Sequence, residues 1–256
     1  MIHYHGTPIS GAEKNQMALS GKHAFISFAA SQHIELIAEI CQSFAIDNGA
    51  YSAWTSGKHF DLDGFGFFLE TWHRHPSFDW YILPDVIGGD HIKNEEIRST
   101  WRKKVPDDIW AKGVPVWHLH EPIEVLRDMV NLGMLYNQFP RVAFGSGDFA
   151  NVGTRKWWNR MAQAMEVCCD EQGRPKVKLH GLKMLDPAVF SHLPLASADS
   201  TNVARNCGID KAWKGPYSPA TTYGRALVMM ERIEMHASAS RWSNTSGINR
   251  NLELFG

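Results

Sequence analysis

Eight short apolar segments are spaced along the whole chain, and most of them end at a polar or ionisable residue. Each has the length of a buried β-strand, whereas the regions between them repeat apolar residues every three or four positions, as one face of a helix requires. This alternation predicts repeated units of strand and crossover helix. The segments are Ile2–His5, Ala24–Phe28, Phe44–Asp47, Tyr81–Asp85, Val114–His118, Val142–Ser146, Val177–His180 and Leu193–Asp199.

Eight such units in 256 residues match the size of an α/β fold of the (β/α)8 TIM-barrel type. An open, doubly wound sheet is the alternative, because periodicity reports elements and not closure. No low-complexity or Pro/Ser-rich linker divides the chain, so we expect residues 1–256 to form a single catalytic domain. In such a barrel the active site lies at the carboxyl ends of the strands.

The composition restricts the cellular setting and the partners. No apolar run approaches the roughly 18 residues that span a bilayer, and the first residues do not resemble a secretion signal. We therefore expect a cytoplasmic protein without a membrane partner. The four cysteines form no CxxC pair, which argues against a zinc knuckle or a disulfide framework. With a net charge of −1, nucleic-acid binding would require a local patch, and the oligomeric state is left open.

Aspartates stand at the ends of three of the apolar segments. Asp47 is followed by Asn48 and Gly49, Asp85 follows Pro84, and Asp199 follows a run of small residues. Each could serve only a turn, since Asp-Asn-Gly is also a common turn sequence. Turns do not explain why three aspartates occupy equivalent strand ends, so we predict a cluster of carboxylates at one rim of the barrel.

The order of short motifs resembles the barrel of tRNA-guanine transglycosylases and their DNA-acting relatives. The resemblance spans most of the chain. The motifs are Asp47-Asn48-Gly49-Ala50-Tyr51, Pro84-Asp85, Val142-Ala143-Phe144-Gly145-Ser146-Gly147, Leu179-His180-Gly181 and Asp199-Ser200-Thr201-Asn202-Val203-Ala204-Arg205-Asn206.

This resemblance implies a role for each motif. Asp47 would be the general acid/base, and Asp199 would be the nucleophile at the anomeric carbon. Asp85 would hydrogen-bond the departing base. The remaining expected substrate-binding residues are Tyr51, Gly145, Ser146, Gly147, His180, Asn202 and Arg205.

The chain departs from the tRNA enzymes in one respect. Those enzymes carry a cysteine-rich zinc site after the last strand, and only Cys207 is found there in this sequence. We therefore expect no metal, no other cofactor and a DNA partner, either single-stranded or with a flipped base. The predicted activity is that of a DNA glycosylase acting on a modified base in phage or bacterial DNA. A base-exchanging DNA transglycosylase of the same fold is an alternative.

The histidines support a different class of enzyme. His3 and His5 alternate in the first segment, His118 and His120 lie at the end of the fifth, His180 ends the seventh, and Asp199 closes the eighth. This pattern resembles metal-dependent amidohydrolases, whose barrels bind zinc that activates water. A catalytically inert barrel that binds nucleic acid is a third possibility.

A basic and aromatic run follows the sixth segment. Arg155 and Lys156 precede Trp157 and Trp158, and basic groups beside exposed aromatic rings suit a phosphate backbone with unstacked bases. The same tryptophans could equally belong to the core.

Overall fold

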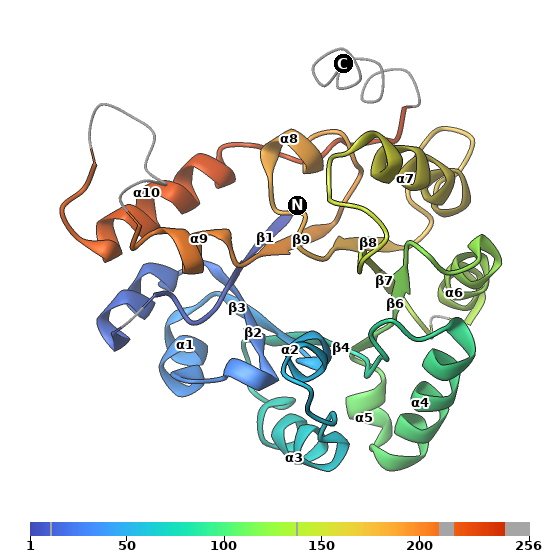
Figure 1. Ribbon diagram of the computed structural model, residues 1–256, viewed down its shortest axis with the longest axis horizontal. Coiled ribbons are helices and arrows are strands. Elements are labelled where there is room, and N and C mark those ends of the chain that lie inside the picture. Colours follow the sequence, from blue (N-terminus) through green and yellow to red (C-terminus); the bar gives the residue numbers. More distant parts are fainter. Residues whose placement is uncertain (11, 137, 210–217, 244–256) are drawn as a thin grey trace.

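In the computed structural model, a barrel of parallel strands is surrounded by helices (Figure 1). The structure describes residues 1–10, 12–136, 138–209 and 218–243. Within these residues, nine strands form one sheet in the order β5-β4-β3-β2-β1-β9-β8-β7-β6. The strands are β1 (Ile2–Gly6), β2 (His23–Ser27), β3 (Ser43–Asp47), β4 (Phe78–Ile82), β5 (Gly113–Val114), β6 (Val116–His118), β7 (Arg141–Gly145), β8 (Lys178–Gly181) and β9 (Ser197–Ser200).

Helices follow most strands and cover the outside of the barrel. Several begin at a side-chain cap that accepts a hydrogen bond from a free backbone N–H of the first turn, such as Asp90 and Thr154. They are η1 (Glu13–Leu19), η2 (Phe28–Ala30), α1 (Ile34–Ile40), α2 (Ala50–Thr55), α3 (Leu62–Trp72), α4 (His91–Lys104), α5 (Asp107–Trp110), α6 (Ile123–Tyr136), α7 (Arg155–Cys168), α8 (Pro187–Phe190), α9 (Asn202–Asn206) and α10 (Thr222–Glu234).

The two end strands of the sheet are consecutive in the chain and complete the barrel. β5 pairs with β4, β6 pairs with β7, and only Pro115 separates them. The backbone changes partner at this proline: Val114 O accepts from Leu83 N, whereas Pro115 O accepts from Ala143 N. The predicted barrel is therefore confirmed. The predicted single strand Val114–His118 is two short strands, because proline has no N–H for a continuous ladder.

Two other strands differ from the prediction by more than one residue at a boundary. β4 begins at Phe78 and ends at Ile82, so Asp85 lies in the following loop. β9 covers only Ser197–Ser200, and the apolar residues of the segment that precedes it, such as Leu193 and Leu195, are buried outside the strand. Hydrophobicity reports burial, and buried loops carry the same signal as strands.

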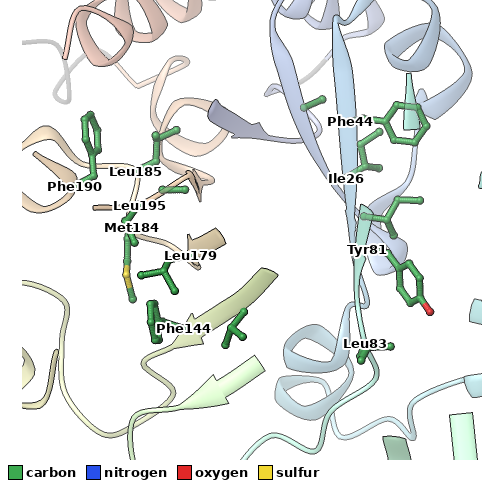
Figure 2. Close-up of a cluster of buried hydrophobic side chains, with 14 of the residues drawn as sticks. Ile26, Phe44, Tyr81, Leu83, Phe144, Leu179, Met184, Leu185, Phe190 and Leu195 are labelled. Carbon is green, nitrogen blue, oxygen red and sulfur yellow. The ribbon is translucent and has the colours of Figure 1, made fainter. Parts of the chain in front are cut away.

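The strands separate two hydrophobic layers. Outward-facing side chains meet the helices, and Figure 2 shows Ile26, Phe44 and Tyr81 in this layer. Inward-facing side chains fill the barrel, namely Tyr4, Phe25, Ala45, Trp80, Ile82, Val114, Val116 and Ala143. Because side chains alternate along a strand, the inward positions nearest the carboxyl ends form the floor of the rim.

Candidate functional site

The three predicted aspartates lie at the same end of the barrel. Asp47 is the last residue of β3, Asp199 is the third of four residues in β9, and Asp85 follows β4 by three residues. All these strands are parallel, so their carboxyl ends share one rim. The negative charges of Asp199 and Asp85 both act on Asp47, which places the three carboxylates within electrostatic reach of one another.

Asp47 is held at the rim by two donors to one oxygen. The Ser27 hydroxyl, from the neighbouring strand, donates to Asp47 Oδ2 at 3.0 Å, and Gly49 N–H donates to the same atom at 3.1 Å. Gly49 has φ +78°, a left-handed conformation that glycine adopts without strain. Burial, followed by the charge of Asp199, raises the pKa of Asp47 to about 6 against these two hydrogen bonds. This carboxyl group can gain or lose a proton near neutral pH.

Asp199 is held in place by a histidine ring and by a backbone N–H. His180 Nε2 lies 3.2 Å from Asp199 Oδ1, and the backbone N–H of Lys183 donates to the same oxygen at 3.1 Å. His180 is fully buried, and its Nδ1 lies 2.8 Å from Ser197 Oγ. Both ring nitrogens are therefore engaged within the barrel. The prediction that His180 binds substrate does not fit this arrangement, because the His180 ring lies below Asp199 and contacts the Asp199 carboxylate instead.

Asp85 is bonded through both carboxylate oxygens. Asn48 Nδ2 donates to Asp85 Oδ1 at 2.7 Å, and His118 Nε2 lies 2.9 Å from Asp85 Oδ2. The same Asn48 amide donates to Leu83 O at 2.8 Å, so the loop after β3 is fastened to the loop after β4. Asp85 is 9% exposed, which leaves an accessible acceptor in a largely buried polar setting.

His118 pairs with Asp85 through its ring nitrogen Nε2. Burial lowers the pKa of His118, but the hydrogen bond from its ring to Asp85 and the charge of that carboxylate outweigh burial, and the pKa is raised overall. Glu121 Oε2 accepts from His118 N at 2.9 Å, and Asn94 donates to the other Glu121 oxygen at 2.8 Å. The floor beneath Asp85 is thus a network of satisfied buried polar groups, which fixes the position of the carboxylate.

The predicted glycine-rich segment has three different environments. Gly145 is buried, and a Cβ at this position would lie 2.9 Å from His118 Nδ1, so the glycine leaves room for that ring. The Ser146 hydroxyl accepts from Trp157 Nε1 at 2.9 Å. Gly147 is exposed and has φ +51°, and a Cβ at this position would meet only open space. The segment lines the rim, and its glycines serve His118 packing and a turn.

Two aromatic rings and a lysine are exposed above the carboxylates. Tyr51 is 43% exposed and Trp54 is 47% exposed, both on α2, and their ring centroids are 5.9 Å apart. Lys183 Nζ lies 3.7 Å from the centroid of the Tyr51 ring. Lys183 has φ +59°, a conformation that non-glycine residues rarely adopt. In this conformation the Lys183 backbone N–H donates to Asp199, while the Lys183 side chain lies over the Tyr51 ring.

Two predicted substrate-binding residues lie beside the site without contacting the aspartates. Asn202 and Arg205 are exposed on α9, directly after β9. Asn202 Oδ1 accepts from Asn206 Nδ2 at 2.5 Å, and within the described chain neither residue bonds to Asp47, Asp85 or Asp199.

The tryptophans of the basic run belong to the core. Trp157 is fully buried and Trp158 is 2% exposed, so neither ring can stack on a base. Arg155 and Lys156 are exposed at the start of α7, which follows β7 at the carboxyl rim. The run therefore contributes charge to the rim, and the aromatic surface is on α2.

The first histidine pair faces away from the barrel interior. His5 Nε2 contacts Glu234 of α10 at 2.9 Å, and His3 Nε2 contacts His236 O at 3.0 Å, whereas Tyr4 between them points inward. Zinc ligation at the rim, as in amidohydrolases, would need these rings on the inner face. Among the residues that the structure describes, no group of three or more His, Cys, Asp or Glu side chains is arranged to hold a metal ion.

Ser27 and Lys183 of the site were not predicted from the sequence, and His118 was considered only as a candidate zinc ligand. Ser27 and His118 end strands, so their positions carry the same signal as the aspartates, although nothing in the sequence pairs them with Asp47 and Asp85. Lys183 has no such signal, because its contacts depend on a left-handed backbone conformation after β8.

Comparison with protein-family models and with curated protein sequences gives no match, so the geometry of the rim carries the functional argument. None of the helices in the described ranges combines the length and the apolar composition of a membrane-spanning segment.

Proposed function

We propose that this protein is a DNA glycosylase that cleaves the N-glycosidic bond of a modified base in phage or bacterial DNA. The observation that supports this most strongly is a pair of carboxylates at one rim with different surroundings. Asp47 has a pKa raised to about 6, whereas Asp199 accepts from Lys183 N–H and contacts His180. Enzymes that cleave glycosidic bonds use two carboxyl groups in unequal environments in this way.

The proposed roles follow from the charges that develop as the bond breaks. The sugar becomes positive, and Asp199 would attack the anomeric carbon or stabilise the oxocarbenium ion. The leaving base becomes negative, and protonated Asp47 would donate a proton to it and then activate water. Asp85, held by Asn48 and His118, would accept hydrogen bonds from the base edge.

The rim suits an unpaired nucleotide. A base inside a duplex cannot reach buried carboxylates, so it must be flipped or single-stranded. Tyr51 and Trp54 offer exposed ring faces beside the site, and Lys183, Arg155 and Lys156 offer positive charge for phosphates. The four cysteines are free and buried, which suits the reducing cytoplasm.

The test is release of a base from DNA. Purified protein is incubated with single-stranded DNAs that carry canonical or modified bases, and mass spectrometry measures free base and abasic sites. We expect release from at least one modified DNA, a loss of at least about a thousandfold in Asp199→Asn, and unchanged release in Asp128→Asn, an exposed aspartate on α6. A labelled free base in the reaction distinguishes hydrolysis from exchange, because only a transglycosylase would incorporate the label.

Absence of release from every DNA would overturn the proposal. Equal loss in Asp199→Asn and Asp128→Asn would also contradict it, because the effect would then not come from the rim.

A further inference from the structure

A chain of buried polar side chains runs through the barrel interior and ends at Asp199. Arg141 Nη1 donates to Ser197 Oγ at 2.6 Å, Ser197 Oγ lies 2.8 Å from His180 Nδ1, and His180 Nε2 lies 3.2 Å from Asp199 Oδ1. Ser197 and His180 are fully buried, and Arg141 is 7% exposed. Three strands supply the chain, because Arg141 is on β7, His180 on β8 and Ser197 and Asp199 on β9.

Aromatic rings enclose this chain and fix its geometry. The Trp80 ring lies edge-on to His180 with centroids 4.7 Å apart, and the Arg141 guanidinium lies 5.0 Å from the Trp80 ring. Phe25 packs against His180 at 5.6 Å. The imidazole is therefore held in one orientation by packing on several sides.

The hydrogen bonds have one consistent direction. Arginine can only donate, so Ser197 Oγ accepts from Arg141 and keeps its own proton to donate. Burial lowers the pKa of His180 below its usual value, so at pH 7 and above the ring is neutral and carries one proton. If that proton were on Nδ1, the lone pair of Nε2 would face the Asp199 carboxylate. If it is on Nε2, Ser197 donates to Nδ1 and His180 donates to Asp199.

We propose that His180 is a positioning residue for Asp199, locked as the Nε2–H tautomer by Ser197 and Arg141. The bonds from His180 Nε2 and Lys183 N both end on Asp199 Oδ1, so Oδ2 is the oxygen directed to the substrate. The chain of Arg141, Ser197 and His180 orients the Asp199 carboxylate towards the anomeric carbon. The expected effect on kcat rests on the proposed glycosylase function, whereas the His180 tautomer and the direction of its hydrogen bonds do not.

The tautomer is tested first, on the wild-type protein. Long-range ¹H–¹⁵N spectra of protein labelled at histidine nitrogens distinguish a protonated ring nitrogen from an unprotonated one, and His180→Gln identifies the His180 signals. We expect Nε2 protonated and Nδ1 unprotonated from pH 7 to pH 8. An Nδ1–H tautomer or an imidazolium ring would overturn the proposal, even if the protein released no base from DNA. Ser197→Ala is expected to shift these signals and Ser197→Thr, which keeps the hydroxyl, to preserve them.

The kinetic arm separates orientation from substrate binding. We expect His180→Leu to lower kcat for base release by about 10- to 100-fold with KM nearly unchanged, as for other residues that orient a reacting group. His180→Gln keeps an N–H donor at the position of Nε2, and we expect it to recover at least half of that loss on a logarithmic scale. Circular dichroism and thermal melting establish that each variant is folded, and Ser197→Ala replaces His180→Leu if that variant does not fold. Unchanged kcat in a folded variant would overturn the positioning role.

Discussion

Asp47 and Asp199 show how neighbouring residues place one side-chain type in two different environments. Asp47 receives hydrogen bonds from Ser27 and Gly49, but burial and two negative neighbours outweigh them, and its pKa rises to about 6. Asp199 receives Lys183 N–H and contacts a histidine that ends an arginine-led chain. These two environments underlie the proposed division of roles, in which Asp47 would donate a proton to the base and Asp199 would act at the sugar.

The raised pKa of Asp47 predicts a cost in stability. The folded protein binds this proton more tightly than the unfolded chain, so ionisation destabilises the fold as the pH rises from 3.8 to about 6. At pH 8 the cost has an upper bound of about 3 kcal/mol. Asp47→Asn removes the charge and keeps an oxygen that accepts from Ser27 and Gly49. We therefore expect Asp47→Asn to be inactive and to melt several degrees higher at pH 8, with almost no gain at pH 4.

Thermal melting at the two pH values checks this prediction, with Asp128→Asn as the control for an exposed charge on α6. An equal change at pH 8 and pH 4 would mean that ionisation of Asp47 is not the cause.

At the residue scale, the sequence predicted the carboxylates better than their partners. Asp47, Asp85 and Asp199 could be found because each follows an apolar run, and strand ends of a parallel barrel share one rim. His180 was predicted to contact substrate, but the alternation of β8 turns it into the interior. The contacts of Lys183 depend on a positive φ that no local pattern encodes.

At the scale of elements, the Glu234 carboxylate attaches α10 to β1 and to the residue that precedes β2. Glu234 contacts His5 Nε2 at 2.9 Å and accepts from Lys22 Nζ at 2.5 Å. His3 and His5 were candidates for zinc ligands because alternating residues share a face. The sequence could not say which face, and Tyr4 occupies the interior because its aromatic ring packs there against Phe25 and Trp80.

The anchor of α10 predicts a pH-dependent contribution to stability. Burial alone would raise the pKa of Glu234, but the bonds from His5 and Lys22 outweigh burial and lower it to about 2. The stabilisation is therefore present above pH 4.5 and is lost as the pH falls towards 2. Because Glu234 is 29% exposed, solvent screening reduces the effect, and we expect Glu234→Gln to lower the free energy of unfolding at pH 7 by about 1–2 kcal/mol.

Urea denaturation at pH 7 and at pH 3 measures this difference, which should narrow at the lower pH. Glu231→Gln, an exposed glutamate one turn earlier on α10, is the matched control. If both variants lose the same stability at pH 7, the contacts of Glu234 do not anchor the helix.

The strand pattern predicted elements but not how the barrel is completed. The segment Val114–His118 was correctly predicted as extended, yet it pairs with β4 before Pro115 and with β7 after it. This change of partner depends on which strands meet in space, and residues far apart in the sequence decide it. Periodicity shows which side chains are buried, but it does not show which strands pair. The open sheet is therefore excluded only by the observed strand order, in which β1 pairs with β9 and β5 continues into β6.

For the molecule as a whole, the net charge of −1 confines any attraction for DNA to part of the surface. Lys183, Arg155 and Lys156 are exposed at the carboxyl rim, where the three aspartates lie. Lys103, at the last turn of α4, is exposed at the opposite end of the barrel, because α4 runs from the end of β4 back to the start of β5. The proposed function therefore predicts that the first group contacts phosphates and that Lys103 does not.

Salt dependence of binding tests this distribution of charge. Three phosphate contacts with a single strand give a slope of about −2 in log K against log [NaCl]. We expect this slope for a fluorescently labelled single-stranded oligonucleotide bound to the inactive Asp47→Asn protein, measured by anisotropy between about 50 and 300 mM NaCl. Lys156→Gln in that background should reduce the slope by about 0.7, whereas Lys103→Gln should leave it unchanged. Equal effects of the two substitutions would mean that DNA binds without regard to the rim, and the placement of the substrate over Asp47 and Asp199 would then be wrong.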